Sequence, residues 1–308
     1  MRAIKDVDYG KIEVNEYVIH FCRCRSLGAG NSTFCRLESE SASRRAGMPV
    51  LADHPFRFIH IPKTGGETIE KLISVTKHHF TATDHQFDGQ SSPRPFVVTI
   101  IRNPYDRVWS WFKFCIHGFK KHHPGPALFC KPALNAFLAA SKRLGNSTVG
   151  LPNATLVSAW QQTLWQWMQA VDGFMLRPEV RRPRSSYDKN DIARFSMVDY
   201  LVHWPSDTYA ADFVIRFEHY EQDLAALLEC LGPPWNKLNA SRFHENSSGS
   251  DATRAMQPAT KEVLGFFAHL SGLTWHQVFT SATREWVCRW FGEDFEYFGY
   301  SRGGAGGS

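Results

Sequence analysis

The stretch FRFIHIPKTGGETIEKLI, residues 56–73, predicts the fold of this chain. It opens with a short apolar run, continues through Pro-Lys-Thr-Gly-Gly, and ends with Ile69, Leu72 and Ile73 at helical spacing. We therefore expect a buried strand, a glycine loop and a helix. Such a loop binds anions, because its backbone N–H groups and the helix dipole favour negative charge and the glycines admit a phosphate group. Lys63 adds a full positive charge.

The rest of the chain alternates between strand and helix patterns. Apolar runs predict strands at 57–61, 96–101 and 212–218. Helical periodicity and capping signals predict helices at 66–77, 104 to about 120, 155–170, 220–231 and 284–300. This alternation indicates an α/β fold with a parallel sheet flanked by helices.

A second motif, IIRNPYDRVWSWFKFC at residues 100–115, places an arginine where its predicted strand ends. Asn103 can cap the following helix, and Pro104 suits the first helical position. The buried stripe of this helix is predicted to consist of Val108, Phe112, Cys115 and Phe119. Arg102 and Ser110 are then available to bind an anion. Two anion sites at neighbouring strand ends suggest a ligand that is phosphorylated at both ends.

The nearest mechanistic alternative is the loop of nucleotide triphosphatases, G-x-x-x-x-G-K-[ST]. In that loop the lysine follows the glycines, whereas Lys63 precedes them. The neighbouring strand would also end in an acidic residue that holds magnesium, but this strand ends in Arg102. Magnesium-dependent phosphoryl transfer is therefore disfavoured.

Charge and composition limit the class of partner. A formal net charge of +5 indicates an anionic partner without identifying it, and we expect no nucleic acid. No apolar run is long enough for a membrane span, so we expect none in this chain. Five N-x-[ST] sequons favour the secretory pathway, at Asn31, Asn146, Asn153, Asn239 and Asn246.

The N-terminal part of the chain differs from the remainder. Its spacing of one histidine and three cysteines fits no structural zinc pattern, so we expect disulfides or plain thiols there and no metal: His20, Cys22, Cys24 and Cys35. We predict an N-terminal extension at 1–54, one domain at 55–301 and a flexible tail at 302–308.

The two motifs resemble those of a known family. FIHIPKTGGET is similar to the 5′-phosphosulfate loop, and RNPYDRVWSWF to the 3′-phosphate segment, of sulfotransferases that use 3′-phosphoadenosine 5′-phosphosulfate (PAPS). The similarity is specifically to the Golgi carbohydrate type, which includes the heparan, dermatan and chondroitin enzymes. The resemblance continues through VIRFEHYEQDLAALLECLG, HENSS and GEDFEYFGY, and so covers roughly residues 55–301. It implies a single domain with a P-loop-like parallel sheet, metal-free sulfuryl transfer and a location in the Golgi lumen.

The resemblance also assigns site residues. The 5′-phosphosulfate would be held by Lys63, Thr64, Gly65, Gly66, Glu67 and Thr68. The 3′-phosphate would be held by Arg102 and Ser110, and a loop over the nucleotide would include Asn246 and Ser247. Loops of the family usually have a second small hydroxyl residue where this chain has Glu67. A carboxylate that faces an anion would be unfavourable, so we expect Glu67 to point away or to serve the acceptor side.

Sulfuryl transfer also needs a base that takes the proton of the acceptor hydroxyl. The segment HFTA resembles the family's histidine segment, which favours His79 as this base. His85 is the second candidate, His78 the third, and Glu67 a carboxylate alternative. Solvated surface histidines are the ordinary interpretation of the same residues.

The implied acceptor is a carbohydrate, and an acidic glycan is one candidate. Two basic stretches could contact it, KFCIHGFKKHH with Lys113, Lys120 and Lys121, and RPEVRRPRSSYDK with Arg181, Arg182 and Arg184. Charge runs of this kind are also common on solvated surfaces. Two other functions stay open, a kinase on a related P-loop fold and a non-catalytic protein that binds polyanions and keeps the nucleotide pocket.

Overall fold

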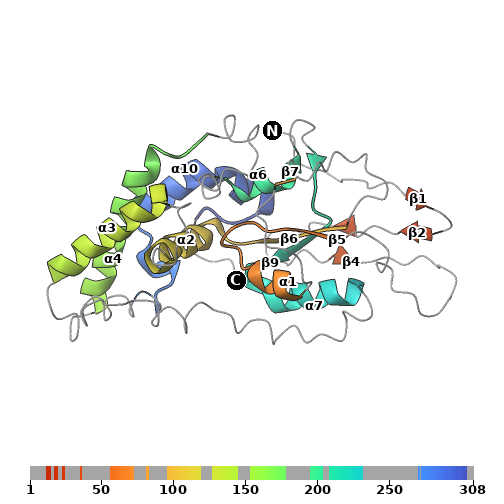
Figure 1. Ribbon diagram of the computed structural model, residues 1–308, viewed down its shortest axis with the longest axis horizontal. Helices are drawn as coiled ribbons and strands as arrows, with labels where there is room; N and C mark the ends of the chain where they lie inside the picture. The colour runs from red at the N-terminus through yellow and green to blue at the C-terminus, as the bar shows by residue number, and fades with distance from the viewer. Residues whose placement is uncertain are drawn as a thin grey trace.

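The computed structural model describes residues 12–14, 17–19, 23–24, 35–36, 56–72, 81–82, 96–118, 127–144, 153–177, 195–203, 208–231, 270 and 272–303. Figure 1 shows a central sheet with helices on both of its faces and a group of long helices at one end. The predicted α/β fold with a parallel sheet flanked by helices is therefore confirmed.

The sheet consists of three parallel strands in the order β5 (Phe56–Ile59), β6 (Phe96–Ile101) and β9 (Phe213–Arg216). Ile59 is in register with Thr99, and Ile101 with Arg216. The carboxyl ends of all three strands therefore lie at one edge of the sheet. The predicted strand at 57–61 is shorter than expected, because β5 ends at Ile59, although His60 and Ile61 stay buried.

Helices cover both faces of the sheet (Figure 1). On one face, Val98 and Ile100 belong to a core shared with α1 (Glu67–Leu72) and α7 (Tyr220–Leu231). On the other face, Val97 and Ile101 pack in a core with α6 (Met197–Leu201) and Phe298 of α10 (Ser281–Phe298). Because β6 is buried on both sides, its sequence is apolar except for Thr99, whose hydroxyl donates to the carbonyl of Ile59 at 3.0 Å.

A helical core adjoins the sheet. It is formed by α2 (Pro104–Gly118), α3 (Ala127–Leu144), α4 (Asn153–Asp172), α9 (Trp275–Val278) and α10. Its largest fully buried side chains are Trp109, Trp160, Trp167 and Trp286. These tryptophans pack the core instead of lining a cleft. A disulfide between Cys115 and Cys130, which the sequence did not predict, joins α2 to α3.

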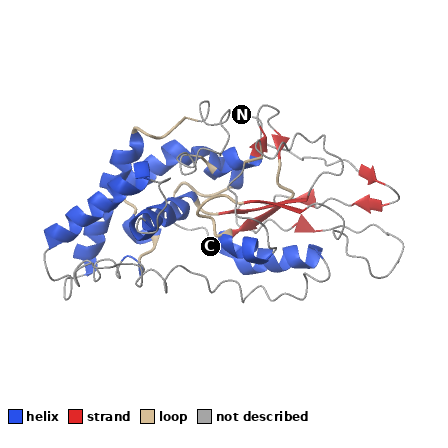
Figure 2. Cartoon of the chain, in the orientation of Figure 1, coloured by secondary structure: helices blue, strands red, loops and turns tan. Residues whose placement is uncertain are grey.

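The remaining elements are short, as the colours of Figure 2 show. The strands β7 (Val202–His203) and β8 (Thr208–Tyr209) form a hairpin, and a 3-10 turn, η2 (Phe217–His219), leads from β9 into α7. Near the N-terminus β1 (Ile12–Val14) pairs with β2 (Tyr17–Ile19), and β3 (Arg23–Cys24) with β4 (Cys35–Arg36). Across the described ranges, no helix combines the length and apolar character that a membrane crossing requires.

Most predicted helices are present with shifted ends. The expected helix at 104–120 is α2, whose residues Val108, Phe112 and Cys115 are buried as predicted. Phe119 and the segment 73–77 lie outside the described residues. Helix α3 was not predicted. The expected domain boundaries after residues 54 and 301 stay predictions.

Candidate active site

The loop between β5 and α1 has the tight backbone that its glycines suggested. It turns through two residues with positive φ, Lys63 at 68° and Gly65 at 96°. A Cβ atom on Gly65 would lie 2.7 Å from the ring of Phe217, and one on Gly66 would lie 2.6 Å from the ring of His60. Both glycines are therefore required for packing of the loop against its neighbours.

Two buried hydrogen bonds hold the underside of the loop. The hydroxyl group of Thr64 donates to the carbonyl of Ile61 at 2.7 Å, and Thr64 is fully buried. From α2, Arg107 donates through Nε to the carbonyl of Pro62 at 3.2 Å. The Thr64 hydroxyl is thus directed into the protein, so an anion contact from Thr64 would come from its backbone amide.

A buried pair of side chains, His60 and Glu70, packs beneath the loop. Nδ1 of His60 lies 2.5 Å from a carboxylate oxygen of Glu70, and both side chains are almost fully buried. The backbone amide of Glu70 also donates to the carbonyl of Gly66 at 3.1 Å. These contacts tie the end of β5 to the first turn of α1. Sequence reasoning missed this pair; its signal is a histidine and an acidic residue that flank the same glycine loop.

Arg102, which follows β6, reaches the loop directly. Its Nη1 donates to the carbonyl of Lys63 at 3.3 Å, and its Nε pairs with the Asp106 carboxylate at 2.7 Å. The guanidinium group lies 4.0 Å from the ring centroid of Phe217, the ring that also contacts Gly65. The two segments predicted to bind anions are therefore in contact.

Glu218 positions the start of α2. One carboxylate oxygen accepts from the backbone amide of Asn103 at 2.6 Å, and the other accepts from the hydroxyl of Tyr300 at 3.0 Å. Burial, followed by the negative charge of Glu218, raises the pKa of Tyr300 well above its ordinary value, so this phenol remains a donor. Asn103 caps the helix as predicted, because its Oδ1 accepts from the amide of Tyr105 at 3.0 Å.

A second buried charge lies beneath the site. Arg107 donates to the carbonyl of Phe195 at 3.0 Å and lies 3.8 Å from the carboxylate of Asp294, which is completely buried. That carboxylate also accepts from the amide of Val198 at 3.0 Å. Burial raises the pKa of Asp294 to about 6, and the positive charge of Arg107 opposes this increase. Sequence reasoning missed this pair, because its members are far apart along the chain.

One face of α2 lies beside the loop between β5 and α1. Asp106, Ser110, Lys113 and Phe114 share this face because they are four, seven and eight residues apart. The Lys63 ammonium lies 4.2 Å from the ring centroid of Phe114, which is 39% exposed. The side chain of Lys63 therefore extends along the face that carries Ser110.

The structure does not describe every predicted site residue. Glu67 is exposed at the first position of α1, and the expectation that its carboxylate points away from an anion stays a prediction. Thr68 is described only as part of the helix backbone. The other candidates lie outside the described residues: His78, His79, His85, Lys120, Lys121, Arg181, Arg182, Arg184, Asn246 and Ser247.

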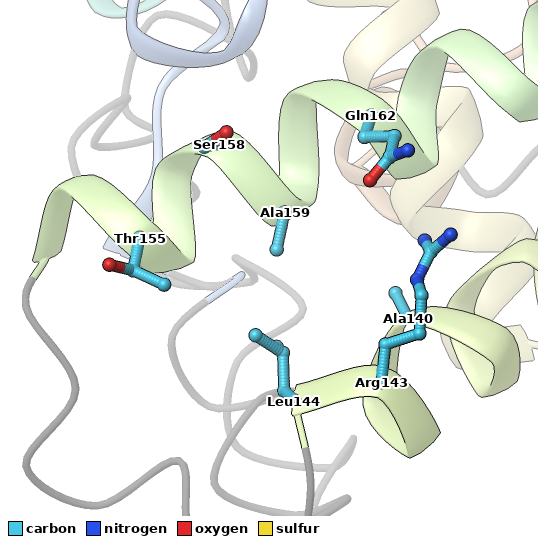
Figure 3. Close-up of a pocket in the computed structure, with 7 residues that line it drawn as sticks. All are labelled: Ala140, Arg143, Leu144, Thr155, Ser158, Ala159 and Gln162. Carbon is cyan, nitrogen blue, oxygen red and sulfur yellow. The ribbon is translucent and has the colours of Figure 1, made fainter.

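A shallow hollow lies elsewhere, between the end of α3 and the start of α4 (Figure 3). Its lining residues are Ala140, Arg143, Leu144, Thr155, Ser158, Ala159 and Gln162. None of them comes from the loop, from the turn after β6 or from α2. We therefore place the chemistry at the strand ends, where the charged groups meet, and not in this hollow.

The fold and the site together define an α/β protein whose charged groups gather where parallel strands end, a place suited to an anionic ligand. A model described as the sulfotransferase family matches residues 48–301, so this chain belongs to the sulfotransferase family. Its activity is therefore the transfer of sulfuryl groups. No curated protein and no solved structure matches the chain.

Proposed function

We propose that this protein transfers the sulfuryl group of PAPS to a hydroxyl group of a carbohydrate, with a histidine as base and without a metal ion. The observation that supports this proposal best is the contact between Arg102 Nη1 and the Lys63 carbonyl at 3.3 Å. A donor with phosphate groups at both ends can bind across this junction. Its phosphosulfate would lie at the loop and its 3′-phosphate beside Arg102.

The donors near Arg102 fit a phosphate group. In the part of the chain that the structure describes, Nη2 of Arg102 and the hydroxyl of Ser110 form no hydrogen bond. A guanidinium nitrogen just before α2 and a hydroxyl on its second turn are suitable donors to phosphate oxygens. The backbone amides of the glycine loop would serve the phosphosulfate in the same way.

PAPS would supply the sulfuryl group that is transferred, and its 5′-phosphate would be the leaving group. The acceptor oxygen forms its bond to sulfur as the bond from sulfur to the bridging oxygen breaks, and that electron pair stays on the phosphate. Lys63 stabilises the negative charge that develops on the bridging oxygen. His79 takes the hydroxyl proton, and His85 is the next candidate for this role. Positive charge at the leaving group comes from lysine, so the reaction needs no metal ion.

The acceptor class and the compartment rest on further arguments. The resemblance to carbohydrate sulfotransferases supports a glycan, and an acidic glycan would suit the basic residues Lys120, Lys121, Arg181, Arg182 and Arg184. The buried disulfide between α2 and α3, together with the sequons, supports folding in the oxidising secretory pathway, where the Golgi lumen is the proposed location.

Transfer of labelled sulfate from PAPS to a panel of glycans, in the presence of a metal chelator, tests this proposal. We expect labelled glycan with the wild-type protein and none with Lys63→Ala. Lys131→Ala is the matched control, because Lys131 is exposed on α3. Binding of 3′-phosphoadenosine 5′-phosphate without transfer to any acceptor would favour a non-catalytic nucleotide-binding protein. Phosphoryl transfer that requires magnesium would favour a kinase.

A further inference from the structure

Lys113 lies on the same face of α2 as the residues beside the loop. Ser110, four residues after Asp106 and three before Lys113, lies between these two side chains on one face of the helix. The Lys113 ammonium lies 5.5 Å from the ring centroid of Trp109, one turn closer to the start of α2. The lysine side chain therefore runs back toward the end of the helix where Arg102 lies.

The charge of Lys113 is poorly compensated. Within the described ranges Lys113 forms no hydrogen bond or ion pair, and the nearby carboxylate of Asp106 already pairs with Arg102 at 2.7 Å. Burial lowers the pKa of the Lys113 ammonium, Arg102 lowers it further, and Asp106 opposes both effects. A partly buried ammonium without its own counter-ion is unfavourable, and a bound anion would relieve this cost.

The balance of charge shows what Lys113 would add to the binding of a phosphate dianion. Because the Arg102 guanidinium is neutralised by Asp106, these two groups together offer little net charge to a phosphate dianion. Lys113, on the same face of α2 as Asp106, adds one positive charge. Ser110, between Lys113 and Asp106 on the helix, supplies a neutral donor.

We propose that Lys113 contacts the 3′-phosphate of the donor and makes the site select adenosine nucleotides that carry this phosphate over those that lack it. This inference rests on the proposed function, and it moves Lys113 from the basic stretch predicted for the acceptor to the donor side of the site. Arg102 fixes the position of the phosphate through its contacts with the loop, whereas Lys113 provides the net charge.

Calorimetric titration with two nucleotides tests this assignment. The wild-type protein should bind 3′-phosphoadenosine 5′-phosphate more tightly than adenosine 5′-phosphate. Lys113→Met should weaken binding of the first nucleotide by about 10- to 100-fold and change binding of the second by no more than about twofold, as expected for loss of one charge-assisted contact. Lys113→Arg should keep most of the preference, and the exposed control Lys131→Met should bind both nucleotides as the wild-type protein does.

The outcomes separate this inference from the proposed function. If the wild-type protein shows no preference for the 3′-phosphate, the proposed donor is wrong and the role of Lys113 is refuted with it. The wild-type protein could instead show this preference while Lys113→Met keeps it, or while Lys113→Met binds both nucleotides more weakly by the same factor. In either case only the role of Lys113 is refuted. Thermal unfolding without nucleotide gives a further check, because removal of an uncompensated cation should leave the unfolding temperature unchanged or higher. A fall of several degrees would show that Lys113 is structural, against our inference.

Discussion

Replacement of Gly65 by alanine should disturb the proposed donor site without removing any charged group. Gly65 has a φ of 96°, a conformation that residues with a side chain rarely adopt. A Cβ atom there would lie 2.7 Å and 2.8 Å from two ring carbons of Phe217. The Phe217 ring supports the Arg102 guanidinium at 4.0 Å, so a shift of the ring also shifts Arg102.

The magnitude follows from these two penalties. The unfavourable φ costs roughly 1–2 kcal/mol, and overpacking against a ring costs roughly 1–3 kcal/mol. Together they amount to roughly 2–5 kcal/mol. The Gly65→Ala variant is therefore either less stable by this amount, or its loop moves to relieve the strain. If the loop moves, binding of the nucleotide should weaken by about 30-fold or more, because about 1.4 kcal/mol corresponds to a factor of ten.

Calorimetry with 3′-phosphoadenosine 5′-phosphate and thermal unfolding measure both consequences for Gly65→Ala. Gly173→Ala is the matched control, since a Cβ atom on Gly173 would meet nothing within 4 Å and its φ is not positive. We expect the control to bind and unfold within about 0.5 kcal/mol of the wild-type protein. Wild-type nucleotide affinity and unfolding temperature for Gly65→Ala would refute the role assigned to this loop.

Three further predictions concern other parts of the molecule. The pKa of Asp294 is raised to about 6 from an ordinary 3.8, so between these pH values the folded state holds a proton that the unfolded state has released. Proton binding therefore stabilises the folded state at low pH, and this stabilisation is lost as pH rises from about 4 to above 6. Denaturant unfolding should therefore show the wild-type protein losing on the order of 3 kcal/mol relative to Asp294→Asn between about pH 4 and pH 7; parallel pH profiles would contradict this assignment. The Cys115→Ser/Cys130→Ser double variant should lose about 3 kcal/mol of stability, the value for a closed loop of about 15 residues, and become insensitive to reductant; equal stability of the two proteins would show that the disulfide contributes nothing. His79→Ala should keep wild-type nucleotide affinity while turnover falls by about two orders of magnitude or more, whereas full activity of this variant and an inactive His85→Ala would assign the base to His85.

The elements predicted correctly are those with a strong local pattern. The run predicted at 96–101 has the same two ends as β6, because a strand buried on both faces is made almost entirely of apolar residues. The helix expected at 155–170 is α4, whose buried residues recur with helical period. Helix α3 was not predicted because Pro132 lies inside it, and a proline ordinarily ends a helix. Packing against α2 and α4 and the disulfide at Cys130 stabilise it despite this residue.

In the site, the sequence identified the residues that carry charge but not those that position them. Lys63 and Arg102 stand next to glycine and proline signals, so local patterns select them. Asp294 carries no comparable signal, and the contacts of Glu218 and Asp294 each reach a segment more than 90 residues away along the chain, at separations of 115 and 96 residues. Their roles depend on how α10 and the turn after β9 pack against α2 and α6.

The amino-acid sequence by itself determined the two segments predicted to bind anions, because a strand, a glycine turn and a helix start are specified by residues close together along the chain. Only the tertiary structure decided that these segments touch, since the contact of Arg102 with Lys63 spans 39 residues and depends on the pairing of β5 with β6. Local helical spacing puts Lys113 and Ser110 on one face of α2 and pairs Arg102 with Asp106 four residues later, but tertiary packing brings this face beside Lys63. The charge available to a ligand is therefore a property of the folded arrangement, which sets which charges neutralise each other and which stay uncompensated.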